Sequence, residues 1–108
     1  MTSTQIAWAA GLFEGEGCIT YRDKNHTQPY IKMNMTDFDV IRKFQDVVGS
    51  GAVYPVYKSR ENPKWKDQLL WRQGNRQEVI RILSAFLPHF GDRRAHKALD
   101  ILDNLECK

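Results

Sequence analysis

The sequence predicts an α+β domain in which two β-hairpins form one antiparallel sheet and helices cover one of its faces. Two observations predict this class. Apolar residues recur at helical spacing in some segments and alternate with polar residues in others. These segments follow in the order α-β-β-α-β-β-α-α, without an internal repeat, low-complexity tract or linker. The length of 108 residues fits a single domain, residues 1–108.

Four segments carry their apolar residues at helical spacing, and we expect helices over residues 3–14, 37–48, 75–86 and 92–106. A spacing of i, i+3, i+4, i+7 puts the apolar side chains on one face of a helix. Ser3 or Thr4 is expected to cap the N-terminus of the first helix. Gly15 and Gly17 are expected to end it, because glycine weakens a helix.

Four other segments alternate apolar and polar residues, and we expect strands over residues 17–24, 29–36, 52–58 and 68–73. Successive side chains of a strand point to opposite faces, so the alternation divides them between core and solvent. The residues expected to face the core are Ile19, Tyr21, Ile31, Met33, Leu69 and Trp71. Those expected on the opposite face are Thr20, Arg22, Lys24, Tyr30, Lys32, Asn34, Gln68 and Arg72. This polar and basic face is the surface expected to meet a partner.

The formal net charge is +3, and its distribution along the chain is uneven. Residues 21–72 hold ten basic and six acidic side chains, whereas residues 1–20 hold two acids and no base. A basic middle fits a polyanionic partner. No run of about 18 apolar residues is present, which excludes a transmembrane helix, and the N-terminus lacks the basic region of a signal peptide. Cys18 and Cys107 have neither zinc nor disulfide spacing, so an intracellular setting is expected.

The first predicted helix has an unusual distribution of small and acidic residues. Ala7, Gly11 and Gly15 recur at every fourth position, and such a stripe lets two helices approach closely. Gly11 costs up to about 1 kcal/mol relative to alanine, so it needs a packing reason. Glu14 and Glu16 stand at the C-terminal end, where the helix dipole opposes negative charge. Two interpretations remain open from these residues alone: a metal-binding carboxylate, or a glycine-rich helix end with two solvated glutamates.

Residues 9–17, Ala-Ala-Gly-Leu-Phe-Glu-Gly-Glu-Gly, resemble the LAGLIDADG motif of homing endonucleases. The departures keep chemical type or size: Ala9 for the leading Leu, Phe13 for Ile, Gly15 for Ala, and Glu14 and Glu16 for the two Asp. The predicted order of elements resembles the family over nearly the whole chain. Residues 87–94 also resemble the stretch that follows the family's penultimate helix.

The resemblance implies the fold, the assembly and the activity. It implies an αββαββα LAGLIDADG-type domain whose curved antiparallel sheet is a DNA-binding face, with helices packed on the other face. A chain with one motif is implied to be a homodimer that cuts a near-palindromic site in double-stranded DNA. The residues implied to lie at the dimer interface are Ala7, Gly11, Glu14 and Gly15. The implied activity is that of a magnesium-dependent, site-specific DNA endonuclease.

The resemblance also assigns roles to individual residues. Glu16 matches the family's catalytic carboxylate, which binds Mg²⁺ or another divalent cation such as Mn²⁺. Arg93, with Arg94 as second choice, matches a basic residue near the active site. Asn34 is the nearest polar residue to the place of a water-positioning side chain, which Met35 occupies here. The residues implied to bind DNA are Thr20, Arg22, Lys24, Tyr30, Lys32, Lys58, Arg60, Lys64, Lys66, Gln68 and Arg72.

The sequence leaves two alternatives to a nuclease open. Relatives that have lost cleavage act as RNA-splicing maturases or DNA-binding regulators, and Met35 at the expected place of a water-positioning residue favours that interpretation. A plain α+β interaction domain with a chance motif is the second alternative. The target sequence stays open, and so does the gene's setting, whether an intron, an intein or a free-standing gene.

Overall fold

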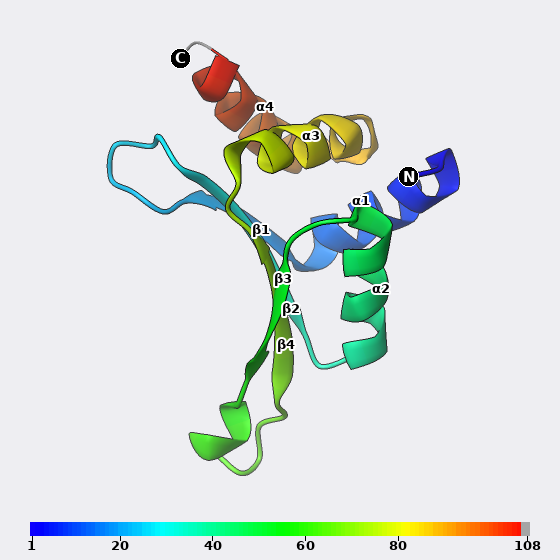
Figure 1. Ribbon diagram of the computed structural model, residues 1–108, viewed down its shortest axis with the longest axis vertical. Helices are drawn as coiled ribbons and strands as arrows, with labels where there is room; N and C mark the ends of the chain where they lie inside the picture. The colour runs from blue at the N-terminus through cyan, green and yellow to red at the C-terminus, as the bar shows by residue number, and fades with distance from the viewer. Residues whose placement is uncertain (107–108) are drawn as a thin grey trace.

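The computed structural model describes residues 1–106, and Cys107 lies outside them. The described chain is an α+β domain whose main elements follow the predicted order (Figure 1). Its helices and strands are α1 (Ser3–Glu16), β1 (Gly17–Tyr21), β2 (Pro29–Met35), α2 (Phe38–Val48), β3 (Ala52–Val56), β4 (Gln68–Gln73), α3 (Arg76–Phe86) and α4 (Asp92–Glu106). Two short 3-10 helices add to them, η1 (Lys58–Arg60) and η2 (Leu87–His89).

The four strands form one antiparallel sheet in the order β1-β2-β4-β3. β1 pairs with β2 in the first hairpin, and β3 pairs with β4 in the second. The two hairpins join where β2 pairs with β4 at the centre of the sheet. Figure 1 shows the sheet nearly edge-on, with the helices on one side and the opposite face uncovered. The predicted fold class is therefore confirmed, including one helix-covered and one open face of the sheet.

An aromatic cluster holds the helices on the sheet. Phe13 of α1 contacts both Phe44 of α2 and Phe86 of α3, with ring centroids 6.4 and 5.9 Å away. Phe44 in turn meets Trp71 of β4 edge to face at 4.8 Å. All four side chains are fully buried. Such aromatic contacts add to the stabilisation that burial of their area provides.

The predicted division of the strands between core and open face is confirmed. Ile31, Met33 and Trp71 are fully buried, and Ile19 and Leu69 are 4% exposed. Tyr21 is half-buried and packs against this core. One buried polar residue, Gln73, was not predicted. Its amide donates to Ser50 Oγ at 3.1 Å and accepts from the Asn75 backbone N–H at 2.9 Å, so burial leaves it satisfied.

The ends of α1 differ from the prediction. Thr2, and not Ser3 or Thr4, is the N-cap, because its side chain and that of Gln5 bind each other's backbone N–H groups in a capping box. The helix continues through Gly15 and ends at Glu16, two residues later than expected. Gly17 follows as the C-cap with extended backbone, and it must be glycine because a Cβ there would lie 2.5 Å from the ring of Phe13.

The first and third strands are shorter than predicted. β1 ends at Tyr21 because the Asp23 carboxylate accepts from the backbone N–H groups of Thr27 and Gln28, each at 3.0 Å, and so builds a turn. Lys24 therefore lies in the turn and not on the sheet. β3 ends at Val56, and η1 begins two residues later. Within residues 1–106 no helix has the length and apolar character needed to cross a membrane.

Candidate active site and nucleic-acid interface

Glu16 lies at the junction between α1 and the sheet. It is the last residue of α1 and is exposed, and Gly17 begins β1 directly after it. The strand register pairs Gly17 with Met33, so Asn34 continues β2 beside this junction. The fold thus places the predicted metal-binding residue at the junction of α1 with the first strand of the sheet.

Arg94 holds this junction in place from the other end of the chain. Its guanidinium donates to the carbonyl oxygens of Gly17 at 2.7 Å and Glu14 at 2.8 Å. It also lies 5.8 Å from the ring centre of Phe13. Cations are favourable at a helix C-terminus, where the last carbonyls lack helical partners. Arg94 therefore brings a positive charge to the acidic C-terminal end of α1 and binds its backbone.

Glu14 also links the end of α1 to the segment at the start of α4. Its carboxylate Oε1 accepts from the backbone N–H of Gly91 at 2.7 Å, and the side chain is half-buried. A Cβ at Gly91 would lie 2.8 Å from this oxygen, so glycine gives the carboxylate its close approach. The observed contact of Glu14 is within the chain, and its role at a dimer interface stays a prediction.

The other three predicted interface residues share an exposed face of α1. Ala7, Gly11 and Gly15 are all exposed. No described atom outside the local helix would lie within 4 Å of a Cβ added at Gly11 or Gly15. The stripe is therefore smooth and open, which is the shape that close packing of two helices requires. The homodimer itself stays a prediction.

A hollow of about 590 Å³ lies between the end of α1 and the start of α4. Its lining residues are Glu14, Gly17, Cys18, Ile19, Arg93, Arg94 and Lys97. Arg93 is exposed, in contrast to the half-buried Arg94. Lys97 was missed by the sequence analysis, although it stands one helical turn after Arg93 on α4. Two positive charges besides Arg94 therefore line a space that adjoins Glu16 along the chain.

Asn34 lies on the open face of the sheet, as expected. It is exposed, and its side-chain amide donates to Gln68 Oε1 on β4 at 2.8 Å. Met35 is half-buried and packs against the core. The structure therefore joins two predicted site residues, Asn34 and Gln68, but the catalytic role of Asn34 stays a prediction.

Glu16 is the one carboxylate that this chain would offer to a metal ion at the predicted site. Among residues 1–106, no group of three or more His, Cys, Asp or Glu side chains could hold a metal ion. Arg94 already occupies the nearby carbonyl oxygens of Glu14 and Gly17. Magnesium needs several hard oxygen ligands and accepts waters and phosphate oxygens among them. One exposed carboxylate per chain fits this demand if further oxygens come from a partner subunit and from nucleic acid.

The predicted DNA-binding residues divide between the sheet and two connecting segments. Arg22 follows β1 directly, and Lys24 lies in the β1–β2 turn. Those on the open sheet face are Thr20, Tyr30, Lys32, Gln68 and Arg72. Those in the segment between β3 and β4 are Lys58, Arg60, Lys64 and Lys66. Two exposed aromatics beside these groups, Tyr54 and Trp65, are 41% and 51% exposed and were not predicted as site residues.

The β3–β4 segment is held by one carboxylate. Asp67 accepts from the backbone N–H of Ser59 at 3.0 Å and from its hydroxyl at 2.7 Å, and these bonds lower the pKa of Asp67. Arg60 stacks over the ring of Tyr57 at 4.4 Å. A shallow hollow of about 490 Å³ is lined by Thr36, Lys58, Lys64, Trp65, Lys66 and Gln68. Lysines around an exposed aromatic suit contact with nucleic acid.

Comparisons with known proteins identify solved structures that share this fold. The sequence matches no protein-family profile and no curated protein. Among solved structures, two of the homing endonuclease I-CvuI superpose with TM-scores of 0.71 and 0.73, at 17% and 16% identity, over 96% and 95% of this chain. Both are complexes with DNA, one with calcium and one with magnesium and uncleaved DNA. The LAGLIDADG meganuclease I-CpaMI bound to uncleaved DNA superposes over 94% of this chain, with a TM-score of 0.60 at 17% identity.

The chain has the fold of the LAGLIDADG homing endonucleases, and the resemblance stated from residues 9–17 is thereby confirmed at the level of the fold. It spans 67% and 66% of the two I-CvuI chains and 37% of the I-CpaMI chain.

Proposed function

We propose that the chain is a site-specific double-strand DNA endonuclease that works as a homodimer with magnesium or manganese. The observation that carries the proposal is the position of Glu16. Glu16 is exposed at the point where α1 joins β1, the first strand of the sheet that carries the predicted DNA-binding residues. The fold shared with DNA-bound homing endonucleases supports the same surface for DNA.

The residues around Glu16 have separable tasks in this proposal. Two copies would pack along Ala7, Gly11 and Gly15, which brings two Glu16 carboxylates together at the two-fold axis. A divalent ion bound there would supply Lewis-acid stabilisation and an activated water. Arg94 fixes the backbone on both sides of Glu16. Arg93 and Lys97 offer positive charge to the phosphate, without a proton-shuttle role for Arg93, because arginine stays protonated.

Cleavage of a randomised double-stranded DNA library tests the proposal. The purified protein is incubated with the library and Mg²⁺, and cleaved ends are sequenced. We expect a near-palindromic site, and we expect Glu16→Gln to lower its cleavage by on the order of 100-fold or more, since even the outer partners of metal ligands are worth 10- to 100-fold. Glu16→Gln keeps the size of the side chain and removes its charge.

Asp46→Asn is the control for that loss of charge, because Asp46 is exposed on α2, away from the proposed site. It should cleave as the unmodified protein does. Cleavage by Glu16→Gln at the rate of this control would overturn the metal-binding role of Glu16.

A binding protein without cleavage is the second candidate, and the placement of Met35 favours it. Met35 packs against the core and has no strong hydrogen-bonding group, and the neighbouring Asn34 amide donates to Gln68. The side chain at the expected place of a water-positioning residue therefore cannot position a water. Enrichment of a DNA or RNA sequence by binding, with no cleaved ends under Mg²⁺ or Mn²⁺, would establish this candidate in place of the nuclease.

A further inference from the structure

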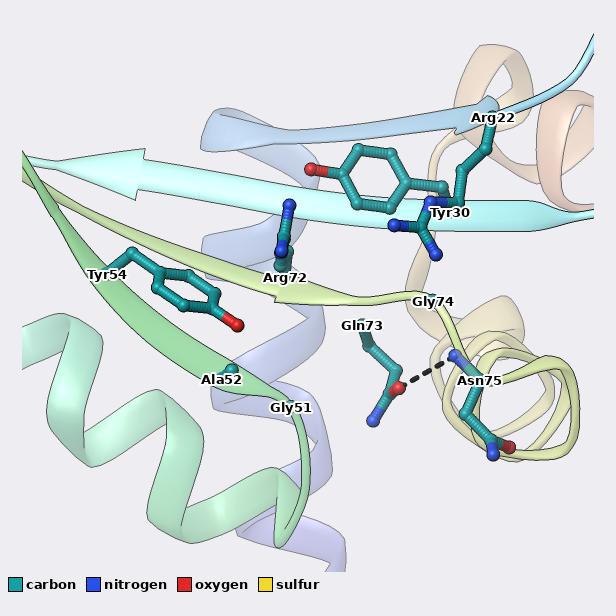
Figure 2. Close-up of a pocket in the computed structure, with 9 residues that line it drawn as sticks. All are labelled: Arg22, Tyr30, Gly51, Ala52, Tyr54, Arg72, Gln73, Gly74 and Asn75. Carbon is teal, nitrogen blue, oxygen red and sulfur yellow. Dashed lines mark hydrogen bonds between the residues drawn. The ribbon is translucent and has the colours of Figure 1, made fainter.

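Arg72 lies near the middle of the open sheet face between two tyrosines. It is on β4, with β2 on one side and β3 on the other, and its register partners are Lys32 and Ala52. Its guanidinium lies 4.6 Å from the ring centre of Tyr54 (Figure 2). Figure 2 shows Tyr30 on the other side of Arg72, and the Tyr54 and Tyr30 hydroxyls raise the pKa of Arg72 above its ordinary value. Two tyrosines from the neighbouring strands therefore flank this side chain.

Arg22, the residue directly after β1, approaches the same place. Its guanidinium lies 5.7 Å from the ring centre of Tyr30, on the side toward Gly74 in Figure 2. A Cβ at Gly74 would lie 3.1 Å from Arg22 Nη1, so the missing side chain makes room for the arginine. Tyr30 thus separates two arginines that face one hollow.

The hollow between these side chains has room for the edge of a base. It measures about 380 Å³, and three of the residues that line it are small: Gly51, Ala52 and Gly74. Within residues 1–106, neither Arg22 nor Arg72 forms a salt bridge. The hollow therefore presents unneutralised guanidinium groups to solvent.

The chemistry of a held guanidinium selects among possible contacts. An arginine fork matches the O6 and N7 acceptors of guanine in the major groove, and this pair discriminates strongly against other bases. A side chain that is already oriented loses less conformational entropy on binding. A phosphate contact needs no such orientation, and the β3–β4 segment supplies lysines for it.

We infer that Arg72 reads a guanine in the major groove of the target, and that Tyr54 and Tyr30 orient it for this contact. The inference rests on the proposed binding of double-stranded DNA. It adds the identity of one recognised base and of the residue that recognises it. Arg22 lies beside it to contact a neighbouring base or phosphate. The half-site should therefore have one position at which guanine depends on Arg72.

Selection of bound sequences tests the inference without any need for cleavage. The purified full chain is incubated with a randomised double-stranded DNA library in the absence of divalent metal, and the bound fraction is sequenced. We expect Arg72→Gln to change one guanine of each half-site to adenine, because glutamine pairs with adenine N6 and N7. The relative enrichment of guanine over adenine at that position should change by on the order of tenfold or more.

Two further variants separate the possible causes. Tyr54→Leu removes the ring that stacks on the Arg72 guanidinium, so it should weaken the guanine preference at the same position and leave the others unchanged. This variant carries the test if Arg72→Gln lowers the melting temperature enough to impair folding. Arg60→Gln is the matched control, because Arg60 is also stacked on a tyrosine but lies in the β3–β4 segment. It should lower affinity for all sequences alike.

The outcomes distinguish this inference from the proposed function. An enriched site that keeps its guanines in Arg72→Gln overturns the inference and leaves DNA binding intact. A uniform loss of affinity in Arg72→Gln, like that of Arg60→Gln, identifies a phosphate contact and also overturns it. Failure of the unmodified chain to enrich any sequence overturns both the inference and the proposed recognition of DNA.

Discussion

Arg93 and Arg94 are adjacent in the sequence but have different surroundings. Arg94 is half-buried and donates to the carbonyl oxygens of Glu14 and Gly17, whereas Arg93 is exposed beside the hollow next to Glu16. From the sequence, both arginines were expected at the start of the last helix, and Arg93 was the first choice for a role near the active site. The sequence could not show what Arg94 binds, because the two partners stand 77 and 80 positions away in the chain.

The difference between the two arginines is measurable as stability. We expect Arg94→Ala to lower the free energy of unfolding by about 2 kcal/mol, since hydrogen bonds to a charged group are worth more than neutral ones. Urea unfolding followed by circular dichroism gives this value. Arg93→Ala is the control and should stay within about 0.5 kcal/mol of the unmodified chain. Equal losses in both variants would contradict the assignment of the two backbone bonds to Arg94.

The β1–β2 turn is an element whose stability depends on one carboxylate. The side chain of Thr27 and the backbone of Gln28 donate to Asp23 and lower its pKa below the ordinary value of 3.8. Because the pKa is lower in the folded state, this stabilisation is fully present above the unfolded pKa. It is lost as the pH falls through the folded pKa.

Removal of the Thr27 hydroxyl should therefore make the melting temperature less dependent on pH in the acidic range. The melting temperature of the unmodified chain should fall more between pH 5 and pH 3 than that of Thr27→Val, because the valine variant lacks the largest cause of the lowered pKa. Thr4→Val, at an exposed position of α1, is the control and should keep the pH dependence of the unmodified chain. The same pH dependence in Thr27→Val would show that the turn contributes nothing to acid sensitivity.

The periodicity of apolar residues predicted the type and orientation of the helices and strands well, but it predicted their ends less well. The buried positions of β2 and β4 follow directly from alternation, since one face of each strand packs against the helices. The end of β1 depended on the side-chain bonds of Asp23, and the start of α1 on the pairing of Thr2 with Gln5. The hollow around Arg72 was not predicted, because it requires the register that sets β2, β4 and β3 side by side.

The exposed stripe of α1 concerns the whole molecule. An exposed glycine inside a helix is unfavourable in a monomer, but it permits close contact with a second copy. We expect Gly11→Leu to convert a dimer to a monomer, measured by sedimentation velocity, because its side chain would separate the helices. Gly11→Ala is the control for loss of the glycine and should remain dimeric. A dimeric Gly11→Leu chain would contradict the proposed contact.

The bonds from Arg94 and Gly91 to the first helix also set an order of events during synthesis. Residues 14–17 leave the ribosome early, but their partners at positions 91 and 94 are made 77 or more residues later. At about 5 to 20 residues per second, roughly 4 to 15 s separate the two segments. The backbone around Glu16 therefore acquires its final shape only when almost the whole chain has been made. An incomplete nascent chain would lack the fixed geometry that we propose for cutting DNA.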